Sequence, residues 1–155
     1  MKQEQAREIG LFFLLGLVDE RVALSAAGRA IAQLKAAEND PKDDSPSAVA
    51  IVEACRASWK MYRKHVPRNQ PTYEPETAWK IPDALDIEVW LRYQKDAPDE
   101  DIMALLFSRV LGFSDADIAE GFQTSIGTIR YRLGKGVRQL GLVSRASNTK
   151  SGAQP

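Results

Sequence analysis

The chain of 155 residues is 44% hydrophobic and 27% charged, a composition typical of a globular protein with one domain or two small ones. Its 21 basic and 21 acidic residues balance, so the total charge does not by itself indicate a nucleic-acid partner. A single cysteine, Cys55, and a single histidine, His65, exclude an internal disulfide framework, a cysteine-rich zinc site and a cluster of histidine metal ligands.

Three stretches before residue 67 carry apolar side chains at helical spacing. Residues 9–18 are apolar nearly all round, which indicates a buried first helix. Acidic residues precede this run, and it is shorter than the ~20 residues of a membrane span, so we expect a cytoplasmic protein without a membrane segment. Residues 22–35 form the second pattern, and a third helix is expected to begin near Ser45 or Ser47.

Four prolines within residues 67–82 predict an extended linker, because each proline removes a backbone donor and disfavours helix before it. Trp79 and Ile81 in this stretch are expected to pack onto a neighbouring surface, and a short helix is expected over 85–93. The chain is thus predicted to be all-α, with a helical module at 1–66, the linker at 67–82, a second module at 83–143 and a disordered tail at 144–155.

Residues 102–140 predict three further helices. Gly112 is expected to end the first of them, and Ser114 to cap a short second helix. After a tight connection, Ser125 is expected to cap the third helix. Apolar side chains recur along that helix at spacings of about 3.6 residues, which predicts one narrow buried stripe. Its members are Ile126, Ile129, Leu133, Val137 and Leu140.

The charges are unevenly distributed around these helices. Acidic residues dominate from Asp96 to Glu120, whereas the chain from Gly121 onward contains basic residues and no acidic ones. On the side of the third helix opposite the apolar stripe lie Thr128, Tyr131, Lys135 and Arg138, with Gly127 nearby and Arg130 and Arg132 flanking. A short helix, a tight connection and an exposed basic helix are the parts of a helix-turn-helix, whose second helix enters the major groove of DNA.

Residues 113–133, FSDADIAEGFQTSIGTIRYRL, resemble region 4 of bacterial sigma factors, especially the small extracytoplasmic-function group. The step Ser125-Ile126-Gly127-Thr128-Ile129 is the most specific part, and the resemblance extends over 99–140. It implies a helix-turn-helix of the winged-helix-like DNA-binding superfamily, without a wing. In that family the second helix of the motif binds the upstream (minus thirty-five) promoter element.

The resemblance also implies which residues contact DNA. Carried over position by position, they are Ser125, Gly127, Thr128, Arg130, Tyr131, Arg132 and Lys135. Arg138 joins them as a phosphate contact because it lies on the same predicted face. The chain departs from the family at Gln123 and Thr124, where a glycine and an apolar residue are usual. Gly134 and Gly136 cost about 1 kcal/mol each relative to alanine, and they either allow a backbone to approach closely or fray the helix end.

The first 70 residues resemble a shortened sigma region 2 only weakly, since its acidic polymerase-binding signature is not clear in residues 18–35. Trp59, Tyr62, Arg63 and Lys64 are candidates for a remnant of the promoter-melting motif, because aromatic side chains stack on unpaired bases. Burial of Trp59 and Tyr62 in the core or against the linker is the favoured interpretation.

The sequence therefore predicts a bacterial DNA-binding transcription factor that resembles a sigma factor and acts in transcription initiation. The expected partners are double-stranded promoter DNA and, by the resemblance, core RNA polymerase, with a protein antagonist as a further possibility. One alternative is a helix-turn-helix regulator that is not a sigma factor. Another is a protein-interaction module with a region-4-like fold that has lost DNA binding.

Enzymatic chemistry, a cofactor and a bound metal are not expected. Cys55 and His65 are ten residues apart, but Cys55 lies on an apolar stripe and His65 at a basic helix end. The acidic residues 99–101 are explained by the favourable charge of a helix start. The chain contains no glycine-rich phosphate loop and no serine-nucleophile elbow.

Overall fold

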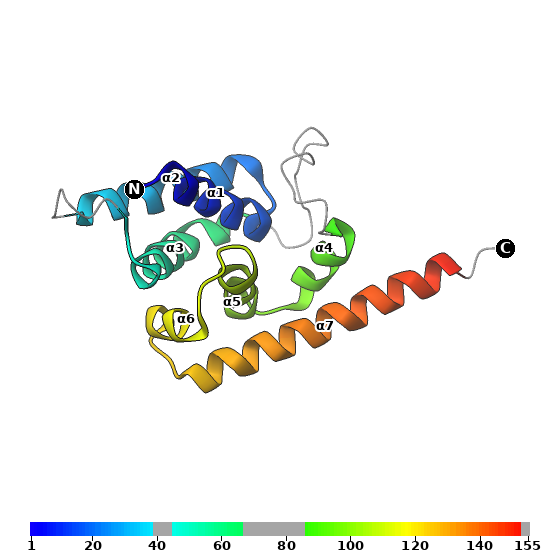
Figure 1. Cartoon of the computed structure of the whole chain (residues 1–155). Coiled ribbons are helices and arrows are strands. Elements are labelled where there is room, and N and C mark those ends of the chain that lie inside the picture. Colours follow the sequence, from blue (N-terminus) through cyan, green and yellow to red (C-terminus); the bar gives the residue numbers. More distant parts are fainter. Residues whose placement is uncertain (39–44, 67–85, 153–155) are drawn as a thin grey trace.

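The computed structural model describes residues 1–38, 45–66 and 86–152, with side chains up to residue 146. Over these ranges the chain is all-helical, which confirms the all-α part of the predicted fold class (Figure 1). The elements are α1 (Gln3–Leu17), α2 (Glu20–Ala37), α3 (Ala48–Tyr62), the 3-10 turn η1 (Arg63–His65), α4 (Ile87–Asp96), α5 (Asp99–Arg109), α6 (Asp115–Phe122) and α7 (Ile126–Gly152). The predicted linker at 67–82, with Trp79 and Ile81, lies outside the described residues.

Most helices begin at a side chain that satisfies the free backbone N–H groups of the first turn. Asp19 accepts from the Val22 N–H at 3.0 Å, and Ser47 accepts from the Ala50 N–H at 3.1 Å. Of the two serines considered for the start of α3, the structure therefore selects Ser47. Ser114 caps α6 as predicted, and Gly112 precedes it at a φ of 68°, a conformation that glycine adopts without strain.

The segments before and after residues 67–85 are packed on one apolar cluster that extends from Ile9 to Ile129. Phe107 of α5 lies at its centre, with its ring centroid 4.5 Å from that of Phe12 in α1 and 6.0 Å from that of Phe122 in α6. The two helical modules expected from the sequence thus share their buried apolar surface.

Polar contacts join the same two segments. The Trp90 indole of α4 donates to the Leu15 carbonyl at 2.8 Å, and the Gln94 amide donates to the Gly16 carbonyl at 2.9 Å. These carbonyls belong to the last turn of α1, where the carbonyl groups have no N–H donors within the helix. Side chains of α4 therefore complete the end of a helix that lies more than 70 residues earlier in the chain.

Trp59 is buried, with 1% of its surface exposed, and its ring packs edge-on against Phe12 at 5.9 Å between centroids. It lies over Gly16, where a Cβ atom would come within 2.8 Å of the indole Cη2. The core interpretation of Trp59 is therefore confirmed, and stacking of this ring on unpaired bases is excluded. Tyr62 is half-buried.

Cys55 of α3 is fully buried, and its burial raises the pKa of the thiol. His65 lies exposed in η1. Because Cys55 is the single cysteine, the rate of reaction with a thiol reagent measures how often this one side chain in α3 becomes exposed. We expect labelling of the native protein to be on the order of a hundredfold slower than in denaturant. Labelling at the rate of a free thiol would contradict this burial.

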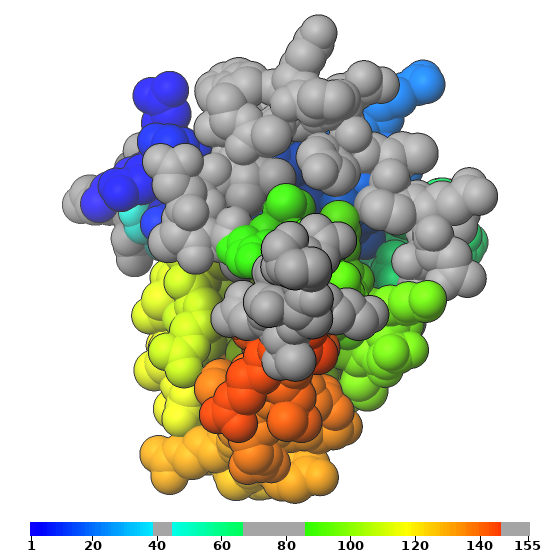
Figure 2. Space-filling view, turned by 90° about the vertical axis from the view of Figure 1, so that its right-hand side faces the viewer, coloured from blue at the N-terminus to red at the C-terminus, as the bar shows by residue number. Residues whose placement is uncertain are grey.

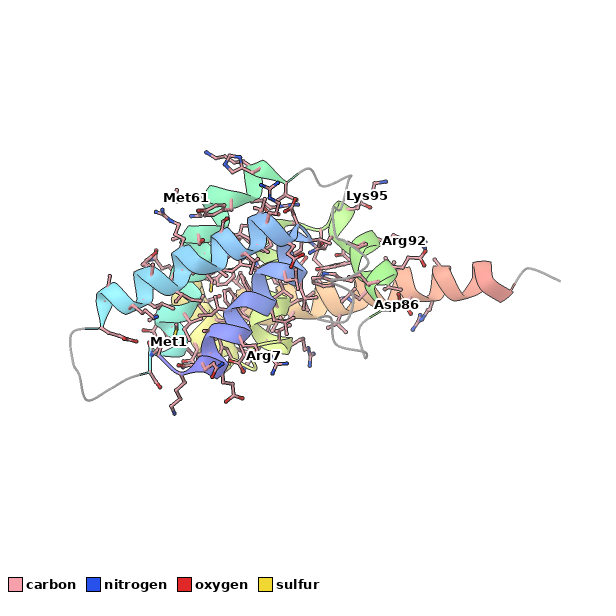
Figure 3. All side chains as sticks on the ribbon, turned by 90° about the horizontal axis from the view of Figure 1, so that it is seen from above. Met1, Arg7, Met61, Asp86, Arg92 and Lys95 are labelled. Atoms are coloured by element: carbon pink, nitrogen blue, oxygen red, sulfur yellow. The ribbon has the colours of Figure 1, made fainter. Side chains whose placement is uncertain are left out.

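Helix α7 is longer than expected. Residues 144–155 were predicted to be a disordered tail, but α7 continues to Gly152, and residues 153–155 lie outside the described part. The difference arises because Ser, Asn and Thr each cost only a few tenths of a kcal/mol relative to alanine in a helix. Adding residues to a helix that has already formed also costs little free energy. Figures 1 and 3 both show the last turns of α7 projecting beyond α4. In Figure 3 the labels of Asp86 and Arg92 mark the position of α4.

The predicted buried stripe of α7 is only partly correct. Ile129 is fully buried, and Leu133 and Leu140 pack against the core, but Ile126 and Val137 are 41% and 47% exposed. Gly136 is buried instead, because a Cβ atom there would lie 2.7 Å from the Leu105 Cδ1 of α5. Gly136 thus serves a close approach between helices and does not fray the helix end.

Candidate nucleic-acid interface

Helix α6, a three-residue connection and helix α7 follow one another where the sequence predicts a helix-turn-helix. Gln123 turns the chain at a φ of 55°, and its N–H donates to the carbonyls of Ala119 and Glu120. This is the left-handed conformation that glycine favours, at one of the two positions where the chain departs from the sigma-factor pattern. The Ser125 hydroxyl then accepts from the Thr128 N–H at 3.1 Å, so the predicted cap of α7 is present.

The first two turns of α7 expose one side to solvent. Ser125, Gly127, Arg130 and Tyr131 are exposed, with 64% of the Tyr131 surface accessible. Ile129 points the other way, into the core, and so orients the helix. In Figure 2, α6 (yellow) and the first half of α7 (orange) together form the lower part of the molecule.

The predicted basic side chains of α7 do not all face solvent. Arg132 Nη2 lies 2.6 Å from Glu100 Oε2, and Lys135 Nζ lies 3.2 Å from Asp101 Oδ2. Arg130 Nε lies 3.2 Å from an Asp115 carboxylate oxygen of α6. The exposed basic face that the sequence predicts is therefore partly neutralised, since α6 supplies a carboxylate to Arg130 and α5 packs beside α7 and supplies those of Arg132 and Lys135.

Arg138 differs from these three cations. It is exposed, and it forms no ion pair with any residue in the described ranges. Thr128 is half-buried, with its hydroxyl 2.9 Å from that of Ser125. The structure thus groups Ser125, Gly127, Thr128, Arg130 and Tyr131 at the start of α7 and leaves Arg138 two turns further along.

Asp99, Glu100 and Asp101 make up the first turn of α5, which we call the acidic turn. Besides α7, it contacts η1 and α3: Asp99 Oδ1 lies 3.2 Å from Arg63 Nε of η1, and Glu100 Oε1 lies 3.7 Å from Arg56 Nη2 of α3. The helix-dipole explanation of these acids is therefore incomplete, because they also bridge two helices. The strong surplus of acidic residues between 96 and 120 was the one signal in the sequence that could have identified them.

Asp101 is the buried member of the acidic turn, with only 6% of its side chain exposed. Lys135 and, at 4.0 Å, Arg132 compensate its charge. Burial, together with the nearby Asp101 carboxylate, raises the pKa of Tyr93 to about 12, so this phenol stays neutral at physiological pH. An open groove runs between the acidic turn and α7. It is lined by Pro98, Asp99, Glu100, Asp101, Thr128, Tyr131, Arg132 and Lys135.

In the described residues, no three His, Cys, Asp or Glu side chains are arranged so that they could hold a metal ion. No helix in the described ranges is both long enough and apolar enough to span a bilayer. No protein-family model matches the chain, and comparisons with curated proteins and with solved structures find no match.

Proposed function

We propose that this chain is a transcription factor that binds double-stranded DNA through the helix-turn-helix of α6 and α7. The observation that carries the proposal is the capped start of α7, where Arg130 and Tyr131 are exposed to solvent while the buried Ile129 holds the helix against the core. Polar and aromatic side chains on the first turns of such a helix reach base edges, and its N-terminus favours phosphate. The resemblance of residues 113–133 to sigma region 4 supports the same interpretation.

The resemblance further suggests a role in transcription initiation, with core RNA polymerase as partner and a protein antagonist as a possible regulator. A pull-down of core polymerase with the full chain, followed by transcription from a promoter library, tests this role. Polymerase binding with promoter-selective transcripts would support a sigma factor. Duplex binding without polymerase binding would favour a helix-turn-helix regulator of another kind.

Replacing Arg138 with alanine tests phosphate contact directly, because this cation is exposed and unpaired among the described residues. We expect weaker binding to all duplexes by a similar factor, and a slope of log K against log salt that is smaller by about 0.9. The measurement is a fluorescence-anisotropy titration of a labelled duplex over a series of salt concentrations.

Arg109→Ala is the matched control, since Arg109 is exposed at the end of α5, away from α7's first turns, and is likewise unpaired among the described residues. This variant should keep the wild-type slope. Equal slopes for wild type, Arg138→Ala and Arg109→Ala would place the phosphate contacts elsewhere.

A second candidate function, a protein-interaction module, has its own supporting observation. Carboxylates of α5 form ion pairs with Arg132 and Lys135, while Val137 and Leu142 of α7 are 47% and 63% exposed. A surface of this kind suits a protein partner better than DNA. The same salt titration distinguishes the two functions, because DNA affinity falls steeply with salt through counterion release. No measurable duplex binding at low salt would favour the protein-interaction module.

A further inference from the structure

We infer that the acidic turn of α5 is an internal competitor of DNA. In this inference, which rests on the proposed function, Glu100 and Asp101 hold Arg132 and Lys135 in ion pairs that must open before these cations can bind phosphate. The acidic turn would thereby lower the affinity of α7 for every duplex, and its release would raise that affinity.

Glu100 contacts cations of two different helices. Its Oε2 lies 2.6 Å from Arg132 of α7, whereas its Oε1 lies 3.7 Å from Arg56 of α3. Arg56 is held independently, because it also donates to the Gly121 carbonyl at 3.0 Å and lies over the Phe122 ring. Glu100 can therefore release Arg132 without losing its partner in α3, and the exchange requires no unfolding.

The pair is also accessible to a polyanion. The Glu100 side chain is 46% exposed and that of Arg132 is 22% exposed, and both line the open groove beside Tyr131. A phosphate that reaches Tyr131 therefore comes close to the acidic turn. It is repelled by the carboxylates until the arginine turns toward it, since like charges at short range oppose each other.

Asp101 makes the closed arrangement the resting one. It is almost fully buried, and a buried carboxylate without a cation is costly. Lys135 Nζ lies 3.2 Å from Asp101 Oδ2, yet this oxygen has no hydrogen bond of acceptable geometry, so the contact is charge attraction alone. The lysine stem is flexible and 33% exposed, which allows the ammonium to leave for a phosphate while Arg132 Nε, 4.0 Å from Asp101 Oδ1, remains the cation near this carboxylate.

The test is a double-mutant cycle on the full chain with a labelled duplex of random sequence. Glu100→Gln removes the charge of a half-exposed side chain and should raise duplex affinity by about threefold to fivefold, the range expected for an exposed ion pair. In an Arg132→Gln background the same change should have little effect, because the cation that Glu100 restrains is absent. Asp101→Asn should raise the affinity further, provided that thermal unfolding shows a folded protein.

Asp96→Asn is the matched control, because Asp96 is exposed at the end of α4 and forms no ion pair in the described ranges. It removes one negative charge without freeing a cation of α7, and at 0.15 M salt its effect should be less than about twofold, since screening acts over about 8 Å. An equal gain from Glu100→Gln in the wild-type and Arg132→Gln backgrounds would overturn the inference and leave DNA binding intact. If neither the wild type nor any of these variants binds a duplex, the proposed function itself is wrong.

Discussion

Replacing Phe107 with alanine is expected to lower the free energy of unfolding by about 3–5 kcal/mol, the cost of deleting a fully buried aromatic side chain. Phe107 is 0% exposed and its ring contacts those of Phe12, Phe113 and Phe122, which come from three different parts of the chain. The remaining side chains cannot all move inward to fill the cavity, because Phe12 and Phe122 are held by α1 and α6 and Phe113 by the segment between α5 and α6. Urea unfolding followed by circular dichroism measures the loss.

Phe113→Ala is the control for this prediction. It deletes the same atoms from a half-buried position and should cost clearly less. The same experiment tests whether the chain unfolds as one unit. Because one apolar cluster joins α1, α5 and α6, we expect tryptophan fluorescence and circular dichroism to report a single coincident transition. Separate transitions would mean that the helices before and after residues 67–85 are independent modules.

Replacing Gly16 with alanine is expected to destabilise the protein by about 3 kcal/mol, the upper range for adding a methyl group to a filled core. A Cβ atom at this position would lie 2.8 Å from Trp59 Cη2 and 3.2 Å from Leu106 Cδ1. The indole ring is rigid and buried, so it cannot turn aside. Thermal unfolding of the variant provides the measurement.

Gly10→Ala on the same helix should have the opposite sign. No atom lies within 4 Å of the Cβ position there, so alanine gains about 0.5–1 kcal/mol through its better helix propensity without any clash. A pair of glycines on one helix thus separates steric contact from propensity. Stabilisation by both substitutions would show that Trp59 does not rest on Gly16.

Several features of the fold could be predicted because their causes lie within a few residues of sequence. The caps at Ser114 and Ser125 depend on a side chain and an N–H group three residues later. The end of α5 before Gly112 depends on a single residue that accepts a positive φ. The burial of Cys55 follows from its place on an apolar helical stripe.

The candidate site could be predicted only in part. The locations of α6 and α7 and the exposure of Tyr131 and Arg138 follow from the helical period and the local charge. The sequence does not predict which of the other basic residues are free of ion pairs with neighbouring helices. A helical pattern describes one helix and says nothing about the helix that packs beside it. The acidic turn is near α7 because α5 packs on it, more than 20 residues away along the chain.

The sequence by itself determined the all-α composition, the starts of α6 and α7, and the placement of basic side chains along α7, because hydrogen-bonded caps and helical periodicity act over one or two turns. Only the tertiary structure decided that Gly136, and neither Ile126 nor Val137, faces the core, and that carboxylates of α5 hold Arg132 and Lys135. These outcomes depend on how closely whole helices approach and at what rotation. That arrangement results from the shared packing of side chains far apart in the chain.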